Sequence, residues 1–164
     1  MTKAVIFDLD GLLINSEVIS HQIIQKFVEP FGYEVTMSDY ADHYSGRSDT
    51  ANIRDVIERF SLPYDLESGL TRSRSIEAEL LAKGVELKRG AKELLEYAKT
   101  NGYQIALASS STGERAMSIL KQHDIADYFD VFVFGDEIER GKPHPDIFLK
   151  ACEKLGEQEA DCLV

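Results

Sequence analysis

Three short apolar runs that contain β-branched residues alternate with longer segments of helical periodicity. The runs cover residues 4–7, 105–108 and 131–134, and a fourth begins at Cys162. Unbroken apolar runs of this length are typical of strands that are buried on both faces of a parallel sheet. Strands that alternate with helices in this way predict an α/β fold with a doubly wound parallel sheet.

Helical patterns fill the intervals between the later strands. One apolar face includes Leu95 and Ala98, and its helix is expected to end near Gly102, a residue suited to a helix C-terminus. Thr112 is a candidate N-cap for the next helix, which carries Ile119 on its apolar face. These helices are expected to connect successive strands of the sheet.

The first connection does not fit this scheme. Nearly a hundred residues separate Phe7 from Ile105, whereas an ordinary crossover needs about a dozen or a little more. The interval carries helical periodicities of its own, so we predict an inserted helical cap at residues 15–82. Residues 1–14 and 83–164 are then predicted to form the α/β core. Ligands of open α/β sheets bind beyond the carboxyl ends of the strands, so the cap is expected to close over that edge.

Composition and charge narrow the class of protein. The 164 residues are 43% hydrophobic and 29% charged, as in an ordinary globular domain, and the net charge of -11 argues against nucleic acid or an anionic membrane as partner. No apolar run approaches the roughly 18 residues of a spanning helix, and the first residues do not resemble a secretory signal. Cys152 and Cys162 are too few for a disulfide framework. We therefore expect a cytoplasmic protein, with a monomer as the default.

Two acids follow the first predicted strand directly. Asp8 and Asp10 stand in the stretch FDLDG, and like charges this close call for a cation or for a reaction that uses both. An EF-hand is excluded, because Leu12, Leu13 and Ile19 stand where calcium ligands and the required glycine would be needed. A role in capping the next helix would explain one acid but not the pair.

The ends of the next two strands also carry polar groups. Ser109, Ser110 and Ser111 follow the second strand, where hydroxyls and amides are suited to phosphate oxygens. Lys142 follows the third strand, in a Gly-Lys-Pro turn before a predicted helix. Because the carboxyl ends of parallel strands meet at one edge, these groups are expected to converge on a phosphate-sized site.

The stretches FDLDGLLINSE, ALASSS and GKPHPDIF, in this order, resemble the first three motifs of the haloacid dehalogenase-like (HAD) superfamily. More narrowly, the chain resembles its β-phosphoglucomutase-like group of capped phosphatases and phosphomutases. The resemblance implies a Rossmann-like core, Asp8 as nucleophile, Asp10 as general acid and base, and Mg²⁺ as cofactor at these two acids. It also implies that Ser109 and Lys142 bind phosphate, with Lys142 counted among the catalytic residues. Ser110, the next residue of the loop, is a further candidate for phosphate binding.

Comparison with the family also concerns the cap and the C-terminus. Gly46 matches a cap loop that faces substrate, and Arg47 is a candidate contact to substrate oxygens. Asp49 stands where the sugar mutases carry an arginine, which favours a phosphatase over a mutase. The fourth motif, an acidic pair after the next strand, is absent, so we expect a C-terminally incomplete core that belongs to a longer enzyme.

The sequence therefore predicts a Mg²⁺-dependent phosphoric monoester hydrolase that acts on a small phosphorylated metabolite, such as a sugar phosphate, through phospho-Asp8. A phosphomutase shares every residue named so far and stays an alternative. A binding module that holds phosphate without turnover is a second alternative. A signalling receiver domain fits less well, because its acceptor aspartate follows the third strand and it lacks a large cap.

Overall fold

The computed structural model describes residues 2–164, which form two compact units. One unit comprises the residues up to Asn15 and from Glu86 onward, and the other comprises Ser16–Val85. The boundaries predicted for the core and the cap lie one to three residues earlier in the chain. Residue 1, which the predicted core includes, lies outside the described residues. The chain thus leaves the first unit after Asn15 and returns to it at Glu86.

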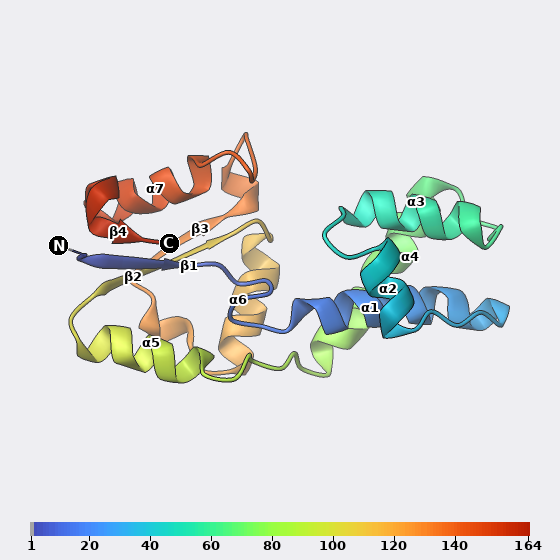
Figure 1. Ribbon diagram of the computed structural model, residues 1–164, viewed down its shortest axis with the longest axis horizontal. Helices are drawn as coiled ribbons and strands as arrows, with labels where there is room; N and C mark the ends of the chain where they lie inside the picture. The colour runs from blue at the N-terminus through green and yellow to red at the C-terminus, as the bar shows by residue number, and fades with distance from the viewer. Residues whose placement is uncertain (1) are drawn as a thin grey trace. The chain divides into compact units, whose positions relative to one another are not determined.

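The first unit is built on a four-stranded sheet with the order β3-β2-β1-β4, and all of its pairings are parallel (Figure 1). The strands are β1 Ala4–Phe7, β2 Gln104–Ser109, β3 Val131–Phe134 and β4 Cys162–Leu163. Strand β2 extends one residue beyond the predicted run at each end. The predicted α/β fold class with a parallel sheet is confirmed.

Helices cover both faces of this sheet. Figure 1 shows α7 on one side and α5 and α6 on the other. Their bounds, with those of the short 3-10 helices of this unit, are α5 Ala91–Thr100, α6 Gly113–Gln122, η2 Ala126–Tyr128, η3 Gly135–Glu137, α7 Asp146–Leu155 and η4 Glu159–Asp161. The predicted cap residue Thr112 accepts a hydrogen bond from the backbone N–H of Arg115, so the predicted start of this helix is confirmed. The sheet is therefore doubly wound.

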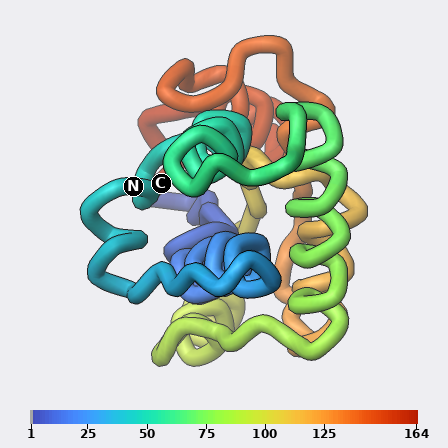
Figure 2. The backbone as a smooth tube through the Cα atoms, turned by 90° about the vertical axis from the view of Figure 1, so that its right-hand side faces the viewer, coloured from blue at the N-terminus to red at the C-terminus, as the bar shows by residue number. Residues whose placement is uncertain are grey.

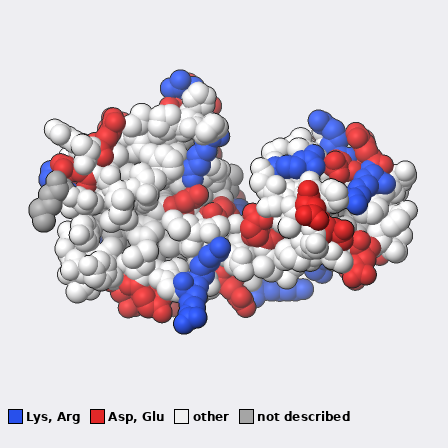
Figure 3. All heavy atoms as spheres, viewed as in Figure 1, with Lys and Arg blue, Asp and Glu red and all other residues white. Residues whose placement is uncertain are grey.

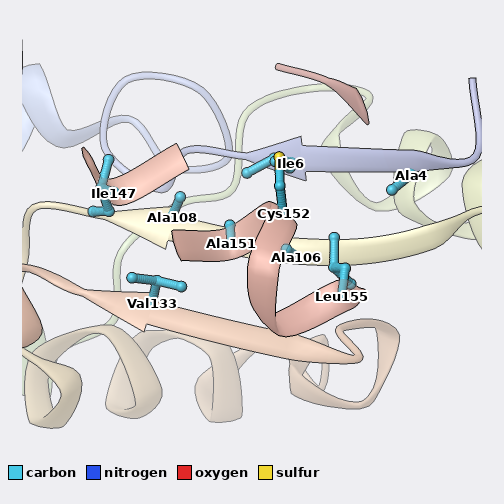
Figure 4. Close-up of a cluster of buried hydrophobic side chains, with 9 residues drawn as sticks. All are labelled: Ala4, Ile6, Ala106, Ala108, Val133, Ile147, Ala151, Cys152 and Leu155. Atoms are coloured by element: carbon cyan, nitrogen blue, oxygen red, sulfur yellow. The ribbon is translucent and has the colours of Figure 1, made fainter. Parts of the chain in front are cut away.

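Small side chains let α7 lie close to the sheet. Figure 4 shows four residues of this helix among apolar residues of β1, β2 and β3. The nine buried residues of the cluster are Ala4, Ile6, Ala106, Ala108, Val133, Ile147, Ala151, Cys152 and Leu155. Burial of this apolar surface stabilises the contact by roughly 25 cal/mol for each Å² removed from water. The contact fixes the helix that follows the Lys142 turn.

The second unit is helical. Its elements are α1 Ser16–Val28, η1 Glu29–Phe31, α2 Met37–His43, α3 Asp49–Arg59 and α4 Leu66–Ala82. Figure 2 follows the backbone from the blue α1 to the green α4, and α4 packs against both α1 and α3. Helix α2 was not predicted, because Tyr40 is its only buried residue. Its start is stabilised by a capping box in which Thr36 and Asp39 exchange hydrogen bonds.

The surface carries charges of both signs. Acidic and basic side chains are interspersed on the visible face of each unit (Figure 3). Within residues 2–164, no helix has the length and apolar character that crossing a bilayer would require. Because 29 acidic residues outnumber 18 basic ones, a site for an anion must supply positive charge locally.

Candidate active site

The candidate site lies at the carboxyl edge of the sheet in the first unit. Asp8 directly follows β1, Ser109 ends β2, and Gly135 directly follows β3. Since these strands are parallel neighbours, their ends lie side by side at one edge. This edge is where open α/β sheets bind ligands.

Asp8 and Lys142 form an ion pair. The Nζ of Lys142 lies 2.8 Å from Oδ2 of Asp8, and Oδ1 of Asp8 accepts a hydrogen bond of 2.8 Å from the backbone N–H of Leu9. Lys142 also donates to the carbonyl of Ala108 at 3.4 Å, and its Nζ lies 5.0 Å from the centre of the Phe148 ring. Both charged side chains are about one-third exposed, so the pair is open to a ligand. The lysine therefore connects the end of β1 to β2.

Asp10 is held by a second cation. The guanidinium of Arg115 donates to both carboxylate oxygens, with NH1 3.1 Å from Oδ2 and NH2 3.1 Å from Oδ1. The hydroxyl of Ser111 donates to Oδ2 at 2.8 Å and accepts a 2.6 Å hydrogen bond from NH1 of Arg115. Each acid of the pair is thus matched by its own basic side chain. The two cations thus balance the two acids within the site, despite the acidic surface.

The serine loop, residues 109–111, lies between the Asp8–Lys142 pair and the Asp10–Arg115 pair. Ser109 is fully buried, and its Oγ accepts a hydrogen bond of 3.1 Å from the backbone N–H of Ser111. Ser110 is exposed, and the carbonyl of Ser111 accepts a 3.0 Å hydrogen bond from the N–H of Gly135. Helix α6 begins directly beyond the loop, so its free N–H groups also favour an anion there.

Gly46 and Arg47 belong to the second unit. Gly46 has a φ of 73°, a left-handed conformation that suits glycine. The guanidinium of Arg47 donates to the carbonyl of His43 at 2.7 Å and lies 3.4 Å from the carboxylate of Asp55. These contacts hold Arg47 within its own unit, and a contact of either residue with substrate stays a prediction.

The second unit also contains a polar cavity of about 150 Å³. Asp49, Arg74 and Glu77 line it, together with the hydroxyls of three neighbouring serine and threonine residues. Asn52 lies there as well, and its amide nitrogen donates to the carbonyl of Tyr44 at 2.9 Å. Its Oδ1 is the only buried side-chain oxygen or nitrogen without a hydrogen-bond partner among the described residues. Two carboxylates beside one guanidinium suit hydroxyl groups better than a second phosphate.

The two carboxylates at the sheet edge provide some of the ligands that Mg²⁺ needs. Mg²⁺ binds through one or two carboxylates, retains several waters and takes further ligands from substrate phosphates, so Asp8 and Asp10 are of the right kind. No group of three or more acidic, histidine or cysteine side chains that could hold a metal ion occurs among residues 2–164. The two aspartates are therefore the groups that would hold the ion.

Sequence reasoning did not identify Arg115. A single arginine in the first turn of a helix usually indicates a solvated charge, and its partner Asp10 lies 105 residues earlier in the chain. The one local signal is its spacing of four residues from Ser111, which places both side chains at the start of α6. Tertiary structure was needed to pair either residue with Asp10.

The parallel sheet carries two acids, a buried hydroxyl and two cations at its carboxyl edge, an arrangement suited to an anionic group. Residues 5–164 match the family described as haloacid dehalogenase-like hydrolase. The chain belongs to this family, so the expected superfamily and the expectation of a hydrolase are confirmed.

Curated relatives and solved structures extend this assignment. The chain is 30% identical to the phosphorylated carbohydrates phosphatase of Thermotoga maritima over 93% of its own length and 70% of that protein. It is 29% identical to the bifunctional riboflavin kinase/FMN phosphatase of Arabidopsis thaliana, covering 100% of this chain and 43% of that one. The crystal structure of a β-phosphoglucomutase-like protein of Thermotoga maritima superposes with a TM-score of 0.87 at 29% identity, over 99% of this chain and 75% of that one. The resemblance to the β-phosphoglucomutase-like group is confirmed.

Proposed function

We propose that this protein is a Mg²⁺-dependent phosphatase that hydrolyses a small phosphorylated metabolite by way of an aspartyl-phosphate, an acyl phosphate formed on Asp8. The observation that carries the proposal is the ion pair of Asp8 with Lys142, 2.8 Å apart beside the buried Ser109. A nucleophilic carboxylate, a charge-neutralising lysine and an anion-binding loop are the parts that phosphoryl transfer requires.

In the first step an oxygen of the Asp8 carboxylate attacks phosphorus, and the bond from phosphorus to the alcohol oxygen breaks. Carboxylate and phosphate repel each other by about 4 kcal/mol per charge pair at ~4 Å and an effective dielectric constant near 20. Lys142 offsets this repulsion, while Ser109 and the neighbouring amides orient the phosphate oxygens. A Mg²⁺ ion bound by Asp8 and Asp10 would supply further positive charge against the phosphate oxygens.

Asp10 moves the protons of both steps. It donates a proton to the departing alcohol oxygen, which would otherwise leave as an unstable anion. In the second step it takes a proton from the water that attacks phospho-Asp8, and phosphate and free Asp8 are released. A second acid next to the nucleophile is of no use to a dehalogenase, because a halide ion leaves without a proton.

The substrate class that we propose is a sugar or polyol monophosphate. The relative from Thermotoga maritima, to which the chain is 30% identical, is named as a phosphatase of phosphorylated carbohydrates. A phosphomutase would pass the phosphoryl group from Asp8 to a sugar instead of water. Analysis of the products formed from glucose phosphates separates the two reactions.

Replacement of Asp8 by asparagine tests the mechanism. We expect Asp8→Asn to lower the hydrolysis of p-nitrophenyl phosphate by roughly 10³-fold or more, because the amide is a poor nucleophile. The full-length protein is assayed with and without Mg²⁺, and retention of the fold is checked by circular dichroism. Asp127→Asn, which changes an exposed aspartate of η2, is the matched control. Full activity in the Asp8 variant would remove the mechanism.

A further inference from the structure

Arg115 and Ser111 enclose the carboxylate of Asp10. Two guanidinium N–H groups and one hydroxyl donate to its oxygens, at 3.1, 3.1 and 2.8 Å. NH1 of Arg115 also donates to the Ser111 hydroxyl at 2.6 Å, so hydrogen bonds join the three side chains. Arg115 is 20% exposed, and much of its side chain is therefore shielded from water. Asp8 has a different basic partner, Lys142, whose Nζ lies 2.8 Å from its carboxylate.

The geometry restricts the orientation of the carboxylate as well as its place. Two parallel N–H donors of a planar guanidinium fix the plane of a carboxylate, which a single lysine ammonium cannot do. The backbone of Arg115 lies in the first turn of α6, where its N–H donates to the side chain of Thr112. Oδ1 of Asp10 accepts a single hydrogen bond from the described residues, and a carboxylate oxygen can accept two. One acceptor position of this oxygen therefore remains.

We propose that Arg115 is a positioning residue that holds Asp10 in the orientation needed for proton transfer to the leaving alcohol. The proposal rests on the proposed function, in which Asp10 is the acid and base. Arg115 neither gives nor takes a proton. The proton passes from the Asp10 carboxyl to the oxygen whose bond to phosphorus breaks, and Arg115 keeps the donor oxygen within reach. Nucleophile and acid are thus held by separate cations, Lys142 and Arg115.

The dependence of the rate on the leaving group tests this role. p-Nitrophenolate is a stable anion that leaves without a proton, whereas the alkoxide of a sugar or polyol does not. For Arg115→Gln we expect kcat/KM to fall by about 10- to 100-fold with an alkyl phosphate such as glucose 6-phosphate or glycerol phosphate. With p-nitrophenyl phosphate we expect a fall of less than about threefold, because kcat/KM covers only the steps up to departure of the leaving group.

The same variant should show a burst of p-nitrophenol. Hydrolysis of phospho-Asp8 needs Asp10 as a base with either substrate, so its slowing lets the phosphorylated enzyme accumulate. Arg115→Lys keeps the positive charge but loses the two parallel N–H donors of the guanidinium. We therefore expect it to show the same kinetic changes as Arg115→Gln. The control is Lys99→Gln, which removes an ion pair of 2.8 Å with Asp130 elsewhere in the same unit and should leave the ratio of the two kcat/KM values unchanged.

Several outcomes overturn the proposal. An equal loss with aryl and alkyl phosphates would show that Arg115 acts on the whole site, and full recovery in Arg115→Lys would show that charge alone matters. If Arg115→Gln does not fold, Arg115→Lys carries the comparison. If the wild-type protein releases phosphate but Arg115→Gln leaves the ratio of kcat/KM for alkyl and aryl phosphates unchanged, the inference fails and the proposed function stands. If the wild-type protein releases no phosphate from any substrate, both fail.

Discussion

Gly135 has no room for a side chain. A Cβ atom at this position would lie 2.1 Å from the carbonyl oxygen of Ser110 and 2.7 Å from its carbonyl carbon. The N–H of Gly135 also donates to the carbonyl of Ser111 at 3.0 Å. The residue after β3 is therefore packed directly on the backbone of the serine loop. A side chain here must displace the loop that carries Ser109, because the obstructing atoms belong to the main chain.

Gly135→Ala is expected to impair both the site and the fold. We expect a destabilisation of about 1–3 kcal/mol, as for other substitutions that overpack an interior. Displacement of the loop should also raise KM and lower kcat for phosphate esters. Chemical denaturation and steady-state kinetics measure the two effects. Gly141→Ala is the control for stability, since a Cβ at Gly141 meets no atom within 4 Å. Equal stability of the two variants would contradict the packing argument.

At the scale of elements, Glu137 ties η3 to α7. Its Oε1 accepts a hydrogen bond of 3.1 Å from the N–H of Phe134, and its Oε2 lies 2.9 Å from Nζ of Lys154. Lys154 also donates to the carbonyl of Phe132 at 2.8 Å, and Lys150 donates to the carbonyl of Glu137 at 3.0 Å. Two lysines of α7 therefore hold the end of β3 and the turn that follows it.

These contacts make part of the stability dependent on pH. The hydrogen bond from Lys154 is the largest influence and, despite some loss of hydration, holds the pKa of Glu137 below its ordinary value of 4.5. A lowered pKa contributes stability above pH 4.5, and this contribution is lost as the pH falls further through the pKa of the folded state. We expect the contribution to be about 0.5 kcal/mol, because the side chain is one-third exposed.

Glu137→Gln should therefore lower the free energy of unfolding at pH 7 and flatten its decline below pH 4.5. Urea denaturation at a series of pH values measures both effects. Glu139→Gln changes another exposed glutamate and serves as the control. The argument fails if the two variants show the same dependence on pH as the wild-type protein.

For the whole molecule, the features that the sequence predicted are those that depend on local pattern. Apolar runs place the strands, because a strand buried on both faces needs apolar residues throughout. The acids come directly after β1 in the chain, so a correct prediction of the strand's end also places them at the edge of the sheet. Helix α2 was not predicted, because a single buried tyrosine gives no repeating pattern of apolar residues. The pairing of Arg115 with Asp10 depends on how two distant segments meet, and no spacing along the chain encodes it.

The insertion after β1 begins and ends at neighbouring points of the first unit. The N–H of Asn15 donates to the carbonyl of Glu86 at 3.1 Å, and between them the chain forms the separate unit Ser16–Val85. Because a flexible linker of a few residues spans about 10 Å, it can replace this unit without strain. The entropic cost of closing so short a loop is also lower than that of the natural insertion.

We expect a variant in which Gly-Ser-Gly replaces Ser16–Val85 to retain a folded α/β core. The sheet and its cluster on α7 lie within the remaining residues, so no strand or helix of that core is removed. Circular dichroism should show the helix and strand content of the core, and thermal unfolding should be a single cooperative transition. The isolated peptide of residues 16–85, which has its own buried helix faces, is the matched experiment. Loss of cooperative unfolding in the shortened variant would show that the core depends on the inserted unit for its stability.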